Sequence, residues 1–247
     1  MFDFQNMVII AVVFLIAGTV KGVIGLGLPT VSLALLTATV GLHPAIALFL
    51  APSLITNIWQ AAVGGSGQAI IRRIWPFLLA SIPTVWIGSS ALSSVDVDLL
   101  SALLGLLLVS YSIIALAKPH ITLPPDWNIW AGPVAGIING ILTGMTGSQG
   151  FPGILYLQAL NLSKDMLVQA MGMLFASSTL MLALSLGGRG MLSFDLGFVS
   201  LASTIPALTG MILGKRLRQN LSDKLFRQFL FIALLILGIY ILVRSFL

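Results

Sequence analysis

The chain has 247 residues, of which 58% are hydrophobic and 8% are charged, and its mean hydropathy is +1.08. A water-soluble domain carries roughly 25% charged residues, so this composition excludes a soluble globule and predicts a protein embedded in lipid. The net charge of +5 does not indicate nucleic-acid binding, because no basic stretch is interleaved with aromatic residues. Basic loops on the cytoplasmic side of a membrane account for the same excess.

Few residue types in the sequence could carry catalysis or hold a metal. There is no cysteine and no glutamate, and the two histidines are His43, at the start of an apolar run, and His120, in a polar stretch. Zinc sites and a Ser-His-Asp triad therefore lack residues, and we expect neither an enzyme nor a metal or other cofactor. The first ten residues contain no basic region, so we do not expect a cleavable signal peptide.

Ten apolar runs follow one another in two sets of five. The first set covers residues 7–25, 28–40, 43–64, 74–92 and 98–117, and the second covers 129–145, 150–160, 164–186, 192–214 and 225–247. Most approach the ~20 residues with which a helix crosses a bilayer. The runs 28–40 and 150–160 are shorter, so we predict half-helices or arms of hairpins there.

The stretch 118–128 separates the two sets and contains three prolines, which forbid a continuous helix. We therefore predict an all-α polytopic membrane protein with a first membrane repeat at 1–117, a cytoplasmic linker at 118–128 and a second repeat at 129–247.

The two halves of the sequence resemble each other. AGTVKG at 17–22 matches AGIING at 135–140, and SIPTV at 81–85 matches TIPAL at 204–208. Five segments per half is an odd number, which would turn the second copy upside down in the membrane. We therefore predict two inverted-topology repeats.

The distribution of basic residues gives an independent prediction of topology. If both termini are extracytoplasmic, nine of the twelve Lys and Arg residues lie on the cytoplasmic side, Arg189 and Arg244 lie outside, and Lys21 lies within the membrane. The loops 65–73, 118–128 and 215–224 are then cytoplasmic. The loops 93–97 and 187–191 are outside.

Each half also contains a glycine-rich interruption of an apolar run. GLGLP at 25–29 includes Gly25 and Gly27, and TGMTGSQGFP at 143–152 includes Gly147 and the side chains of Ser148 and Gln149. We predict that the helix breaks at both places and restarts at a proline. Inverted-repeat transporters bind anions at such breaks near the bilayer midplane. A kink without a ligand is the alternative.

Lys21 lies in the segment just before the first break. A lysine costs about 2.5–3.5 kcal/mol at the centre of a membrane helix, which marks it as a candidate anion-binding residue. The alternative is that its long side chain reaches the membrane interface. Asn139 takes its place in the second copy. No carboxylate lies deep in any run, so we do not expect a buried acid to form a cation site.

The third run of each half carries polar residues where hydrocarbon would leave them unpaired. These are Thr56, Asn57 and Gln60 in the first half, and Ser177, Ser178 and Thr179 in the second. Hydrogen bonds between helices explain any one of them. Their clustering favours a polar cavity, and we include Asn57, Gln60, Ser177 and Ser178 among the candidate binding residues. The spacings Gly18-x-x-x-Gly22 and Gly136-x-x-x-Gly140 instead predict close helix packing.

These motifs together resemble one family of membrane proteins. AGTVKGVIGLGLPTVSLALL, AGIINGILTGMTGSQGFPGILY and PAIALFLAPSLITNIWQA are similar to segments of the sulfite exporter TauE/SafE family, also called the 4-toluene sulfonate uptake permease family. The family's repeat glycines would map onto Gly22, Gly25 and Gly27, and onto Gly140, Gly144 and Gly147.

The resemblance implies a bacterial inner-membrane secondary carrier of sulfur-containing anions such as sulfite, sulfoacetate or an organosulfonate. We expect the anion to bind between the two helix breaks and to be moved by alternating access. An anion channel with the same lining and a membrane scaffold subunit are the alternatives. The expected partners are the small anion and the lipid bilayer, with no nucleic acid. The exact anion, the direction of transport, the coupling ion and the oligomeric state are not fixed by the sequence.

Overall fold

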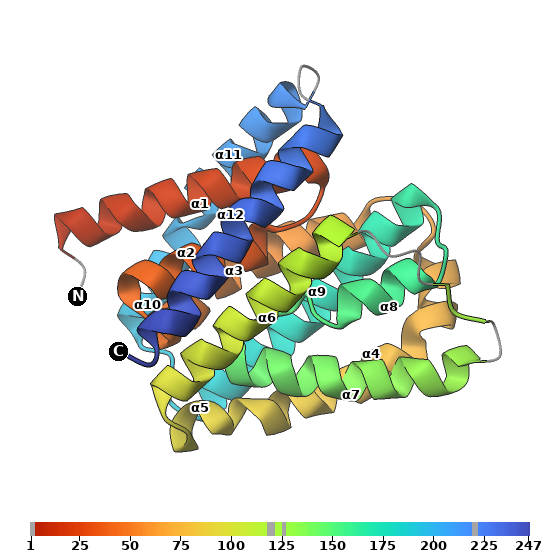
Figure 1. The fold of residues 1–247 in the computed structure, drawn as a ribbon, viewed down its shortest axis with the longest axis horizontal. Helices are drawn as coiled ribbons and strands as arrows, with labels where there is room; N and C mark the ends of the chain where they lie inside the picture. Colours follow the sequence, from red (N-terminus) through yellow and green to blue (C-terminus); the bar gives the residue numbers. More distant parts are fainter. Residues whose placement is uncertain (1–2, 118–121, 125–126, 219–221) are drawn as a thin grey trace. The chain divides into compact units, whose positions relative to one another are not determined.

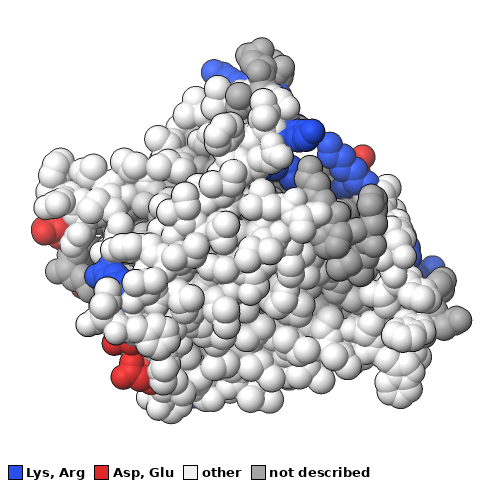
Figure 2. Space-filling view, in the orientation of Figure 1, with Lys and Arg blue, Asp and Glu red and all other residues white. Residues whose placement is uncertain are grey.

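The computed structural model of the protein describes residues 3–117, 122–124, 127–218 and 222–247. Within these ranges the chain forms helices and no strand, and eight helical stretches are long and apolar enough to cross a membrane. On the face shown in Figure 2 most side chains are uncharged. The predicted class, an all-α polytopic membrane protein, is therefore confirmed.

Twelve helices are described (Figure 1). The first six are α1 (Phe4–Ile24), α2 (Leu28–Val40), α3 (Leu42–Ala62), α4 (Gly67–Ser89), α5 (Ala91–Ser94) and α6 (Val97–Ala117). The others are α7 (Asn128–Thr146), α8 (Gly153–Ala159), α9 (Lys164–Gly188), α10 (Phe194–Ala202), α11 (Thr204–Leu217) and α12 (Asp223–Arg244).

Some element boundaries differ from those expected. The predicted loop 65–73 is mostly helical, because only Gly64 and Gly65 adopt left-handed backbone and α4 begins directly afterwards at Gly67. The run 192–214 is divided at Ser203 into α10 and α11. Much of the predicted linker 118–128 lies outside the described residues.

The helices form two compact units. Unit 1 consists of Met1–Pro52, Asp96–Lys118 and Leu192–Leu247, and unit 2 of Ser53–Val95 and Pro119–Met191. Each unit combines segments from both halves of the sequence, so neither unit is one half alone.

In unit 1 the first helix packs along α11. A Cβ on Gly18 would clash with the backbone of Ala207, and one on Gly22 would clash with the backbone of Met211. The predicted role of this glycine pair in close packing is therefore confirmed. The contacts ascend along both helices, so α1 and α11 run parallel.

The helices α6 and α12 also lie side by side in unit 1 (Figure 1). A Cβ on Gly105 would lie 2.8 Å from the oxygen of Gly238 and equally close to the nitrogen of Leu242, while one on Gly238 would lie 3.1 Å from a methyl of Val109. Residue numbers rise along α6 as they fall along α12, so this pair is antiparallel.

In unit 2 the helix α7 packs along α4 (Figure 1). A Cβ on Gly136 would clash with Phe77, and one on Gly140 would clash with Ser81. The packing role predicted for this pair is confirmed. The contacts again ascend along both helices, so α4 and α7 run parallel.

A proline inside α3 is compensated by another helix of unit 1. Pro52 has no N–H with which to bond the carbonyl of Leu48. The hydroxyl of Ser200, on α10, donates to this carbonyl at 2.8 Å and accepts the N–H of Ala51 at 3.1 Å. A side chain thus replaces the missing backbone donor, as membrane helices require.

Candidate functional site

Both predicted helix breaks are present. The helix α1 is terminated by Gly25 (φ 80°), whose N–H donates to the carbonyl of Lys21 at 2.8 Å. The helix α7 is terminated by Gly147 (φ 75°), whose N–H donates to the carbonyl of Thr143 at 2.7 Å. Left-handed backbone of this kind favours glycine at a helix end, so the two breaks have the same local cause.

The chain restarts differently after each break. Gly27 (φ 105°) precedes α2, and Pro29 occupies the first turn as predicted. In unit 2 the helix α8 begins only at Gly153, with Pro152 immediately before it. The segment between Gly147 and α8 is therefore a longer piece of non-helical backbone than its counterpart in unit 1.

The helix ends change one correspondence between the two copies. Counted back from the terminating glycine, Thr143 holds the place of Lys21, because each accepts the glycine N–H four residues later. The match of AGTVKG with AGIING, which pairs Gly22 with Gly140, predicts Asn139 in this place. That prediction is wrong at the break, because the second copy has one more helical turn before its terminating glycine.

Lys21 is buried. Its side chain is 3% exposed, which argues against extension to a water-facing membrane interface. Its backbone carbonyl caps the end of α1, so the charged side chain and the helix break lie within one helical turn of each other in unit 1.

Unit 2 contains a buried chain of polar side chains. Gln149 Nε2 donates to Thr179 Oγ1 at 2.7 Å, and the Thr179 hydroxyl is 3.2 Å from the Ser53 hydroxyl. Asn57 Nδ2 donates to Ser53 Oγ at 3.0 Å. All four residues are at most 2% exposed. The chain thus connects the non-helical segment after α7 to α9 and α3.

Two buried amide groups near this segment are incompletely paired. Asn139 is fully buried, and its Oδ1 accepts the N–H of Gly153 at 3.0 Å while its Nδ2 has no hydrogen-bond partner. Gln149 Oε1 also has none. Such groups are normally paired, because leaving one unpaired costs about 1–3 kcal/mol.

Backbone and side-chain hydrogen bonds hold the non-helical segment itself. Thr143 Oγ1 donates to the carbonyl of Ser148 at 3.0 Å, and Thr146 Oγ1 accepts the N–H of Ser148 at 3.1 Å. Ser148 is 7% exposed, so this part of the non-helical segment is buried as well as held by hydrogen bonds. Thr143 was not among the predicted binding residues.

The other predicted binding residues are placed differently. Gln60 donates to the carbonyl of Val168 at 2.7 Å, and Ser177 donates to carbonyls of its own helix. The bond of Gln60 is the interhelical pairing expected as the alternative to a cavity, whereas the bonds of Ser177 stay within α9. Ser178 is buried, at 2% exposure, in the same helix.

Two members of the polar chain were not among the predicted binding residues. Ser53 lies one helical turn before Asn57 on α3, a spacing that could have identified it. Thr179 was noted as polar but not selected. The side chains of the polar chain are amides and hydroxyls. Among the described residues no three His, Cys, Asp or Glu side chains gather as metal ligands.

The described residues thus form a helical membrane protein with one broken helix in each half of the sequence. The chain belongs to the sulfite exporter TauE/SafE family, whose sequence pattern matches residues 10–241. The resemblance seen in the sequence is thereby confirmed, and membership implies membrane transport of sulfur-containing anions. No curated protein and no solved structure matches the chain.

Proposed function

We propose that the protein is a secondary transporter of small sulfur oxyanions, in the class of sulfite, sulfoacetate and organosulfonates, and that it works by alternating access. Family membership supports the class of anion. The observation that carries the proposed site is the fully buried Asn139 amide, whose Nδ2 has no hydrogen-bond partner beside the second helix break.

The chemistry of the second break suits an oxyanion. Sulfonate and sulfite oxygens accept hydrogen bonds, and Asn139 Nδ2 has two N–H groups to donate. The Thr179 hydroxyl can donate as well as accept, so Gln149 can rotate its amide and present its own NH2 group. Each of the two amides then offers N–H donors beside the second break, and Ser53, bonded in turn by Asn57, holds Thr179 in place.

The first break contributes positive potential in unit 1. Lys21 is buried within one turn of Gly25, and the 13-residue helix α2 begins just after Gly27. A helix N-terminus carries partial positive charge. We assign Lys21, Gly25 and Gly27 to anion binding on this basis.

The inverted repeat is supported by the directions of the helices. Within one half, the chain reverses direction three times between the first and the fourth segment, so these two segments run in opposite directions. In each unit, however, the first segment of one half runs parallel to the fourth segment of the other, as α1 with α11 and α7 with α4. The two halves then have opposite orientations. The antiparallel pairing of the two fifth segments, α6 and α12, agrees with this.

Transport by the purified protein in liposomes tests the proposal. We expect uptake of radiolabelled sulfite or a small sulfonate to saturate and to show counterflow, whereas a channel would show neither. Asn139→Asp keeps an acceptor for Gly153 but replaces the amide donor with a carboxyl group. It should reduce uptake more than tenfold.

The matched control is Gln158→Glu, the same chemical change at an exposed position of α8. It should leave uptake unchanged, and size-exclusion chromatography should show both variants folded. Undiminished uptake by folded Asn139→Asp would contradict the assignment of this site, and uptake that never saturates would contradict a carrier mechanism.

A further inference from the structure

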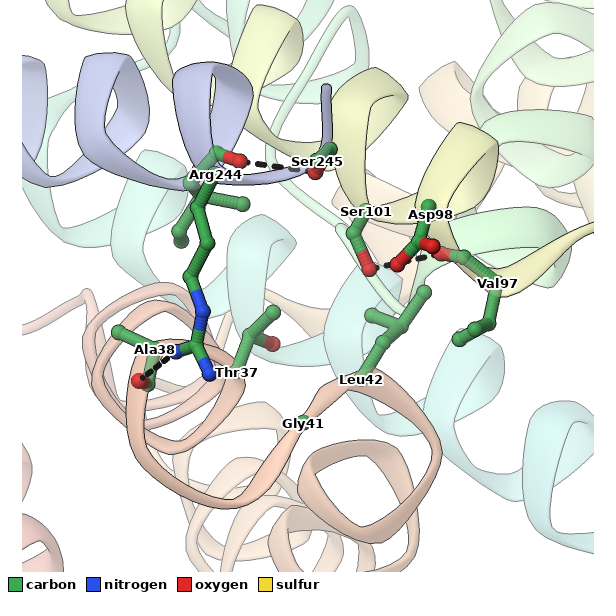
Figure 3. A pocket seen from close by; sticks show the side chains of 10 residues that line it. Thr37, Ala38, Gly41, Leu42, Val97, Asp98, Ser101, Arg244 and Ser245 are labelled. Atoms are coloured by element: carbon green, nitrogen blue, oxygen red, sulfur yellow. Dashed lines mark hydrogen bonds between the residues drawn. The ribbon is translucent and has the colours of Figure 1, made fainter. Parts of the chain in front are cut away.

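A surface pocket of unit 1 is lined by no residue of either helix break (Figure 3). It has a volume of about 160 Å³ and is bounded by the end of α2, the start of α6 and the end of α12. One water molecule needs about 10–15 Å³ on this measure. The pocket therefore has room for a molecule of roughly ten non-hydrogen atoms.

Opposite charges line this pocket. Arg244, at the end of α12, and Asp98, in the first turn of α6, face it from different sides (Figure 3). The Arg244 guanidinium donates to the carbonyl of Ala38 at 2.7 Å, which fixes its position. This bond uses one of the five N–H groups of an arginine.

The polar groups between the two charges also favour a ligand. Thr37 is 6% exposed, lines the pocket, and its Oγ1 has no hydrogen-bond partner. The hydroxyls of Ser101 and Ser245 donate to carbonyls of their own helices, each at 2.8 Å. Their oxygens are then acceptors toward the pocket, while Thr37 can donate or accept.

A helix-capping role accounts for only part of this arrangement. Arg244 binds a carbonyl in the last turn of α2, which is a common way to satisfy a helix end. Capping explains neither the buried hydroxyl of Thr37 nor the carboxylate of Asp98 on the same pocket.

From this arrangement we propose that the pocket binds a small zwitterion that carries an ammonium group and a carboxylate or sulfonate group. The oxyanion would pair with Arg244, and the ammonium group with Asp98. A simple anion would meet the carboxylate, and a simple cation would meet the guanidinium, so each is disfavoured by a like charge. The bound molecule would connect α2, α6 and α12.

Isothermal titration calorimetry on the purified protein at low ionic strength tests this proposal. The probes are glycine, β-alanine and 2-aminoethanesulfonate, compared with propionate, ethanesulfonate and ethylamine. We expect at least one zwitterion to bind at least tenfold more tightly than the matching compounds that lack one charge. Arg244→Gln and Asp98→Asn should each weaken its binding at least tenfold.

Two matched controls remove a charge elsewhere in unit 1. Arg227→Gln acts on the same helix as Arg244, and Asp195→Asn acts in the first turn of α10. Both should bind the zwitterion as the parent does. If Arg244→Gln does not fold, Arg244→Lys, which keeps the charge and a donor for Ala38, should bind within about threefold of the parent, and Asp98→Asn still carries the comparison.

Three results would overturn the proposal. They are the absence of zwitterion binding by the parent, equal binding of ethanesulfonate and 2-aminoethanesulfonate, and unchanged binding by both charge variants. The outcome is independent of the transport site, because Asn139→Asp should retain zwitterion binding in this assay whether or not it transports.

Discussion

Asn139 and Gly153 connect the two sides of the second helix break: the side-chain oxygen of Asn139, on α7, accepts the first N–H of α8 at 3.0 Å. The rest of the Asn139 amide has no partner. The oxygen of this side chain thus connects α7 to α8, and its NH2 group can donate to a ligand. This double role makes its immediate surroundings sensitive to small changes.

Gly153→Ala should impair transport through Asn139. A Cβ at this position would lie 2.6 Å from Asn139 Oδ1 and 2.8 Å from a methyl of Leu174, so the amide has to move. We expect uptake to fall at least tenfold and the free energy of unfolding to fall by about 1–3 kcal/mol. Liposome uptake and denaturant unfolding measure the two effects. Parent-like uptake would show that the position of Asn139 is unimportant.

Gly147→Ala and Gly65→Ala form a matched pair. Both glycines have left-handed backbone, with φ of 75° and 71°, so each alanine should cost about 1–2 kcal/mol of stability. Gly65 lies in the turn between α3 and α4, where an added Cβ meets nothing within 4 Å. Only Gly147→Ala should also reduce uptake. Equal uptake by the two variants would separate the second break from transport.

Lys21→Met should preserve folding and weaken anion binding more than tenfold, equivalent to about 1.4 kcal/mol. The backbone carbonyl that caps α1 is unaffected by this change. Lys21→Arg should be only partly tolerated, because a planar guanidinium does not replace a compact ammonium. Thermal shift with sulfite and sulfonates measures binding. Parent-like affinity of Lys21→Met would leave the lysine with a packing role.

Cysteine labelling of intact cells tests the topology, since the chain has no native cysteine. Val95→Cys should react with a membrane-impermeant maleimide from outside, and Leu217→Cys only after permeabilisation. The pocket in Figure 3 agrees with this, because it brings together the start of α6 and the end of α12, which the topology places on the same side. Labelling of residue 217 from outside would contradict the inverted arrangement.

Ser200→Ala should destabilise the protein by about 1–3 kcal/mol. It leaves the carbonyl of Leu48 and the N–H of Ala51 without the hydroxyl that pairs them across Pro52. Ser203→Ala is the control, because the Ser203 hydroxyl donates to the carbonyl of Val199, four residues earlier, and it should change stability by less than about 0.5 kcal/mol. Similar unfolding midpoints for the two variants would contradict the role of Ser200.

The sequence alone determined the membrane class, the two helix breaks and the close packing of the glycine pairs. These properties depend on local composition and spacing: apolar runs of fixed length, glycines that permit left-handed backbone, and glycines repeated every four residues. It also identified Asn57, Asn139 and Gln149 as candidate binding residues.

Only the tertiary structure decided which hydrogen-bond partners Asn57, Asn139 and Gln149 have. The polar chain from Gln149 to Asn57 passes through Thr179 and Ser53, more than a hundred residues apart in sequence, and no local pattern specifies such a contact. Gln60 and Gln149 look alike in the sequence, yet the amide nitrogen of Gln60 bonds the carbonyl of Val168 and so connects α3 to α9. The burial and direction of a side chain depend on the packing of several helices at once. These two properties distinguish an amide that connects helices from an amide that could bind a ligand, and the sequence alone does not give them.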